Sequence, residues 1–84
     1  MLDYLLTCRS LTYAQRSVRV LGKAGIKAYA VRTPQGTSKE GCGYSVKIRE
    51  DRLTAALKVL EAEKLPPEKV FLLYRDGHTE EAVR

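Results

Sequence analysis

The segment YSVKIR, residues 44–49, has the clearest alternation of apolar and polar residues in the chain. Its apolar residues are Tyr44, Val46 and Ile48, and a polar residue follows each of them. Successive side chains of a strand point to opposite faces of a sheet. The segment therefore predicts a strand with one face in the core and one polar face. The polar face would carry Ser45, Lys47 and Arg49.

The residues before this segment predict a strand, a helix and a second strand. An apolar run over residues 2–8 predicts the first strand, and Ser10 is a good N-cap for the helix that follows. Apolar residues then recur every three or four positions until Gly25, where we expect the helix to end. Residues 26–32 predict the next strand, and residues 33–41 are rich in turn-forming residues.

The residues after the segment predict one more helix and one more strand. Asp51 is the expected N-cap of this helix, which should stop before Pro66. Residues 70–74 predict the last strand. We expect a single domain over residues 1–76, with a polar C-terminal tail over residues 77–84.

The resulting order of elements, βαββαβ, is typical of an α+β, ferredoxin-like sandwich. Rules of strand adjacency and handedness predict a four-stranded antiparallel sheet with strand order 4-1-3-2 and both helices on one face. In this arrangement, one end of the sheet holds three features. They are the end of the first strand, the start of the first helix and the loop before the third strand.

Composition limits the classes of partner. The chain has 84 residues and contains no apolar run near the roughly 20 residues that span a membrane. Its start lacks the basic region of a secretory signal, so we expect a cytoplasmic protein without a membrane partner. The net charge of +5 is spread along the chain, which favours an ordinary solvated surface over a nucleic-acid interface.

Two cysteines, Cys8 and Cys42, are the residues most suited to chemistry. With a single histidine and no CxxC pair, the chain lacks the residues for a zinc site, and we predict no metal and no cofactor. Gly41 and Gly43 flank Cys42, which would leave its sulfur accessible and permit unusual backbone angles. An alternative is that the two glycines only form a bulge.

The predicted topology brings Cys8 close to Cys42, beside the start of the first helix. The helix N-terminus and the guanidinium groups of Arg9 and Arg32 favour an anion there. Such surroundings lower the pKa of a thiol below about 8.5 and increase the fraction of reactive thiolate. We therefore predict Cys42 as the reactive thiol. Cys8 is either a small core residue or a second, resolving thiol.

The chain resembles the small bacterial domain family described as "putative selenium/sulfur carrier protein-like". The resemblance covers residues 4–74 and rests on YLLTCRSLTYAQRSVRVLGKAGIKA, on Pro34 and on the Cys42-Gly43 pair. Ser10 matches the serine at the helix start of the family. The aromatic residue and proline that commonly precede this serine are absent here, since Cys8 and Arg9 occupy those positions. The threonine-histidine pair that often follows the serine is Leu11-Thr12 here.

The resemblance implies a carrier of activated sulfur or selenium rather than a stand-alone enzyme. Cys42 would bear the cargo as a persulfide or selenosulfide. A donor such as a cysteine desulfurase would load it, and an acceptor protein would receive it. Cys8 would resolve the persulfide by forming a disulfide. Site residues expected around the cargo are Arg9, Ser10, Arg32, Gly41 and Gly43.

Two other functions stay open at the level of sequence. The domain could be a regulatory or interaction module that forms a homodimer through its sheet or binds a small ligand, because the fold alone does not decide function. A weaker alternative is RNA binding by an open sheet face. That face would carry Lys27, Tyr29, Lys47 and Arg49.

Overall fold

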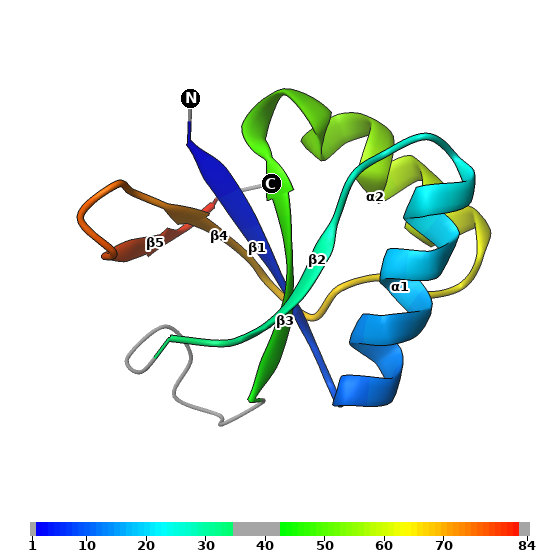
Figure 1. Cartoon of the computed structure of the whole chain (residues 1–84), viewed down its shortest axis with the longest axis horizontal. Coiled ribbons are helices and arrows are strands. Elements are labelled where there is room, and N and C mark those ends of the chain that lie inside the picture. Colours follow the sequence, from blue (N-terminus) through cyan, green and yellow to red (C-terminus); the bar gives the residue numbers. More distant parts are fainter. Residues whose placement is uncertain (1, 35–42, 83–84) are drawn as a thin grey trace.

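The computed structural model describes residues 2–34 and 43–82. The strands form one layer and the two α-helices form the other, as Figure 1 shows. In chain order the elements are β1 Asp3–Cys8, α1 Leu11–Lys23, β2 Tyr29–Arg32, β3 Tyr44–Arg49, η1 Glu50–Arg52, α2 Leu53–Ala62, β4 Val70–Leu73 and β5 Thr79–Glu81.

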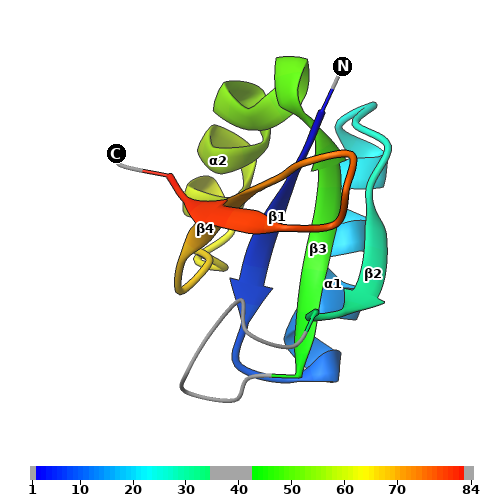
Figure 2. The same cartoon turned by 90° about the vertical axis from the view of Figure 1, so that its left-hand side faces the viewer.

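The sheet is antiparallel, with strand order β2-β3-β1-β4-β5. Both helices lie behind it when the sheet faces the viewer, as in Figure 2. The α+β architecture with two helices and an antiparallel sheet is confirmed. The prediction of four strands is wrong, because β5 extends the sheet beyond β4. The first four strands of the observed order, β2-β3-β1-β4, match the predicted order 4-1-3-2 read in reverse.

The fifth strand forms because the polar segment before it makes a hairpin turn. Gly77 adopts a φ of 94°, which a glycine tolerates without strain. The Tyr74 amide donates to the carbonyl oxygen of His78 at 2.9 Å, and the two rings stack with centroids 4.2 Å apart. The Tyr74 hydroxyl donates to Glu80 at 2.9 Å, which raises the pKa of Tyr74. The His78 amide donates to Asp76 and lowers the pKa of that carboxyl. Polar residues thus build a strand that hydrophobic patterning did not predict.

The main core lies between the helices and the sheet. Leu6 in β1, Leu21 in α1 and Val46 in β3 are fully buried, and Ile48 is nearly so. The apolar face predicted for residues 44–49 is therefore confirmed at Val46 and Ile48.

The opposite face of the sheet also buries side chains, which corrects the prediction of a uniformly polar face on β3. Ser45 is fully buried, and its hydroxyl lies 2.6 Å from the Thr33 hydroxyl. This hydrogen bond satisfies a polar group that burial would otherwise penalise. Leu5 and Phe71 are paired across β1 and β4 and are buried on the same face.

The ends of the helices test the predicted capping residues. The Ser10 hydroxyl caps α1, and Gly25 follows its last turn with a φ of 82°. The predicted cap at Asp51 is wrong, because Asp51 lies inside the 3-10 turn Glu50–Arg52 and α2 begins after it. Two hydrogen bonds between Glu50 and Leu2 hold this turn against the start of β1.

Candidate functional site

Strand register brings two of the predicted site residues, Cys8 and Arg32, to one end of the sheet. Cys8, the last residue of β1, pairs with Tyr44, the first residue of β3, and Arg32 at the end of β2 pairs with the same tyrosine. From Cys8 the chain continues through Arg9 and Ser10 into α1, so the helix begins at this end too (Figure 1). The end of β1 and the start of α1 thus lie at the end of the sheet where β3 begins, as predicted, while residues 35–42 of the loop expected there lie outside the described residues.

Two guanidinium groups are held over tyrosine rings at this end. The Cζ atom of Arg9 lies 5.0 Å from the ring centroid of Tyr13, and that of Arg32 lies 5.6 Å from the centroid of Tyr44. Each cation–π contact contributes about 0.5–1 kcal/mol at an exposed position. The rings therefore restrain the two positive charges that we predicted around the cargo.

Sequence reasoning missed the part that these tyrosines play. Arg9 and Tyr13 are four positions apart around the start of a helix, a spacing that brings side chains together. That spacing could have indicated the first contact. The contact between Arg32 and Tyr44 depends on strand pairing and has no local signal in the sequence.

The start of α1 has the features of an anion-favouring helix end. The Ser10 hydroxyl accepts a hydrogen bond from the Tyr13 amide at 3.3 Å. The amides of Leu11 and Thr12 precede the first intrahelical bond, which joins the Ala14 amide to the Ser10 carbonyl at 3.1 Å. The first turn contains no acidic residue. The partial positive charge of the helix end is therefore not offset from within its first turn.

Replacing Ser10 with alanine should lower the free energy of unfolding by about 1 kcal/mol, because the Tyr13 amide loses its acceptor. Ser10→Asp is the matched control, since aspartate can accept the same hydrogen bond. Urea denaturation measures both variants. Equal stability of Ser10→Ala and the wild type would show that the hydroxyl does not cap the helix.

Cys8 is a core residue in this structure. Its side chain is 6% exposed, and its sulfur donates to the Leu6 carbonyl at 3.5 Å. It belongs to the cluster between the helices and the sheet. A hollow of about 240 Å³ lies beside it, with walls that include Arg9, Tyr13 and Lys64. Of the two readings of Cys8 left open by the sequence, the structure favours packing.

Gly43 is the first described residue after residue 34, and Cys42 and Gly41 lie outside the described residues. The Gly43 carbonyl accepts from the Thr33 amide at 2.8 Å. A Cβ atom at Gly43 would meet nothing within 4 Å, and its φ is not in the left-handed region. Neither packing nor backbone strain therefore requires a glycine at position 43.

The described residues hold no metal-binding group. Residues 2–34 and 43–82 contain no cluster of three or more His, Cys, Asp or Glu side chains that could bind a metal ion. Within the same ranges, no helix has the length and apolar character needed to cross a membrane.

Comparison with known families agrees with the resemblance inferred from the sequence. The model of the family described as "putative Se/S carrier protein-like" matches residues 3–72. The chain belongs to this family. No curated protein matches it. The matched residues include Cys42 and the cationic end of the sheet, by which we mean Arg9, Arg32 and the start of α1. The match ends within β4. The fifth strand therefore lies outside the matched region.

Proposed function

We propose that this member of the Se/S carrier-like family carries activated sulfur or selenium on Cys42 and delivers it to an acceptor protein. The observation that supports this most strongly is the family match over residues 3–72. Within that region, Arg9, Arg32 and the start of α1 supply positive charge close to Gly43, the residue that follows Cys42. Positive surroundings favour the thiolate, which is the nucleophilic form of cysteine.

Loading is a thiol exchange with a persulfide on the donor, for example a cysteine desulfurase. The Cys42 thiolate attacks the outer sulfur of that persulfide, a new S–S bond forms at Cys42, and the donor sulfur leaves with the electron pair of the broken bond. Delivery repeats this exchange toward an acceptor thiolate and restores the Cys42 thiolate. Neither step needs an external oxidant or reductant, so the chain needs no cofactor of its own.

We propose that Cys8 packs the core and does not resolve the persulfide. Resolution would require the Cys8 sulfur to attack the inner sulfur of Cys42 and to expel hydrosulfide. The burial of Cys8 and its bond to the Leu6 carbonyl oppose that attack. We also propose the cytoplasm as the compartment, because a reducing environment keeps both cysteines out of a disulfide.

Intact mass spectrometry tests the carrier function. The protein is incubated with a cysteine desulfurase and cysteine, and the wild type is expected to gain the mass of one sulfur atom, which dithiothreitol removes. Cys8→Ser should gain the same adduct, and Cys42→Ser should gain none. The absence of an adduct on the wild type, or an equal adduct on Cys42→Ser, would overturn the proposal.

RNA binding is not proposed. Among the tyrosine and phenylalanine side chains of the described residues, only Tyr29 is largely exposed, at 58%. Proteins that bind single strands stack successive bases on several aromatic rings. The burial of Leu5, Ser45 and Phe71 also removes much of the open sheet face that RNA binding would need.

A further inference from the structure

The outer edge of β2 presents backbone groups that no other described strand pairs with. β2 lies at one end of the strand order, next to β3 alone. The Thr33 amide donates to the Gly43 carbonyl at 2.8 Å, which makes this a hydrogen-bonded pair. Such pairs alternate along an antiparallel ladder. The N–H and C=O groups of Arg32 and Ala30, one and three residues before Thr33, therefore point away from β3.

An apolar groove lies at the start of this edge, between α1 and the residues that lead into β2. Its volume is about 360 Å³, and its walls include Val18, Gly22, Ile26 and Ala28. The space beside Gly22 is open, because a Cβ atom built at this position meets nothing within 4 Å. Ala28 in the groove wall is small, and so is Ala30, which pairs with the core residue Val46, so an added strand could place larger apolar side chains on this face.

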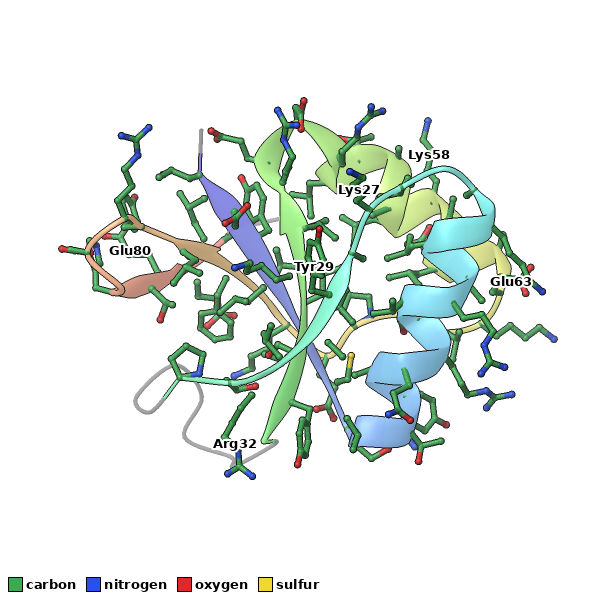
Figure 3. All side chains as sticks on the ribbon, viewed as in Figure 1. Lys27, Tyr29, Arg32, Lys58, Glu63 and Glu80 are labelled. Atoms are coloured by element: carbon green, nitrogen blue, oxygen red, sulfur yellow. The ribbon has the colours of Figure 1, made fainter. Side chains whose placement is uncertain are left out.

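The same edge is basic. Lys27 precedes β2 and Arg32 ends it, and Figure 3 shows both, with Tyr29, distributed along this strand. Lys47 extends the positive charge onto β3, whereas the Arg49 guanidinium lies 3.7 Å from the Asp51 carboxylate. Residues 24–34 and the strand Tyr44–Arg49 contain no acidic side chain. An anionic partner would therefore find no like charge on these two strands.

We propose that β2 is a docking edge for an extended segment of a partner protein in which apolar and acidic residues alternate. The segment adds a strand to the sheet through Ala30 and Arg32. Its apolar side chains enter the groove beside Gly22, and its acidic side chains face Lys27 at the rim of the groove and Lys47 on the other face of the sheet. Main-chain hydrogen bonds supply affinity in this mode of binding, and the groove and charges supply specificity. The proposal is independent of the chemistry at Cys42.

Charge favours this occupant over a second copy of the chain joined edge to edge. Two β2 edges together would concentrate Lys27 and Arg32 of both copies, and like charges across a sheet destabilise the pairing. Nucleic acid fits less well than a peptide, because it offers no repeating partners for backbone N–H and C=O groups. Tyr29 is also the one largely exposed tyrosine or phenylalanine among the described residues.

Fluorescence anisotropy of the full chain with a labelled, end-blocked peptide of alternating valine and glutamate tests the proposal. Gly22→Leu should weaken binding at least about tenfold, because its side chain fills the groove. Gly22→Ala is the matched control, since it improves the helix but leaves most of the groove open. Lys27→Glu should weaken binding to a similar extent. Thermal melts establish that all three variants fold.

Three comparisons complete the test. A peptide with serine in place of valine keeps the charge and should bind weakly. Oligouridine should bind weakly, and light scattering of the protein alone should give a monomer. Failure of the valine–glutamate peptide to bind, or equal binding by Gly22→Leu, would overturn the proposal. It would also be overturned if the serine peptide bound as tightly as the valine–glutamate peptide, or if oligouridine bound more tightly than that peptide. Self-association of the protein through β2 that Lys27→Glu abolishes would overturn it as well.

Discussion

A thiol reagent is expected to modify Cys42 rapidly in the folded protein and to leave Cys8 unmodified until the chain unfolds. Cys8 is 6% exposed and lies in the core cluster, so the reagent reaches it only when the structure opens. Single domains are typically stable by about 5–15 kcal/mol. If Cys8 becomes reactive mainly by global unfolding, its modification should be at least about a thousandfold slower than that of an unfolded thiol.

Two variants assign the rates. Cys42→Ser retains only Cys8 and should react slowly in buffer but quickly in concentrated urea. Cys8→Ser retains only Cys42 and should react quickly in both. Fast reaction of folded Cys42→Ser would show that Cys8 is reachable and would restore it as a candidate resolving thiol. Slow reaction of folded Cys8→Ser would contradict the proposal that Cys42 presents its sulfur to other proteins.

Truncation of Leu6 to alanine should lower the free energy of unfolding by about 2–5 kcal/mol. Leu6 is fully buried in β1, the strand that pairs with both β3 and β4. Truncation of this side chain removes apolar contacts and leaves a cavity in the core between the sheet and the helices. In a small domain this is a large share of the total stability, and part of the population is expected to unfold at moderate temperature.

Leu11→Ala is the matched control for the same chemical change. Leu11 is 39% exposed at the first position of α1, where alanine is also a better helix former. We expect a change of less than about 0.5 kcal/mol for this variant. Urea denaturation followed by circular dichroism measures both. Similar losses in the two variants would show that Leu6 is not part of a close-packed core.

Arg32 connects the two surfaces that we assign. Its guanidinium lies over Tyr44 at the cationic end of the sheet, and its backbone N–H and C=O groups point to the outer edge of β2. A partner segment paired with β2 would therefore end close to the helix start and Gly43. This arrangement would allow a donor or acceptor to dock on one surface while its reactive group approaches the other.

Local sequence patterns determined much of the fold. The alternation in residues 44–49 predicted β3 and its core face, since period two is a property of any strand. Ser10 predicted the start of α1 and Gly25 its end, because capping depends on a few neighbouring backbone groups. The family, too, was evident from the sequence and covers residues 3–72.

Other features depend on contacts between distant segments, and the tertiary structure alone decided them. β5 is polar and forms because its backbone pairs with β4. A pattern of apolar residues cannot predict a strand that is stabilised in this way. Ser45 is buried because Thr33 lies next to it across a strand pair. The contact of Arg32 with Tyr44 and the groove beside Gly22 likewise require the packed sheet. A sequence reports local preferences of the backbone, whereas burial and pairing depend on which segments meet.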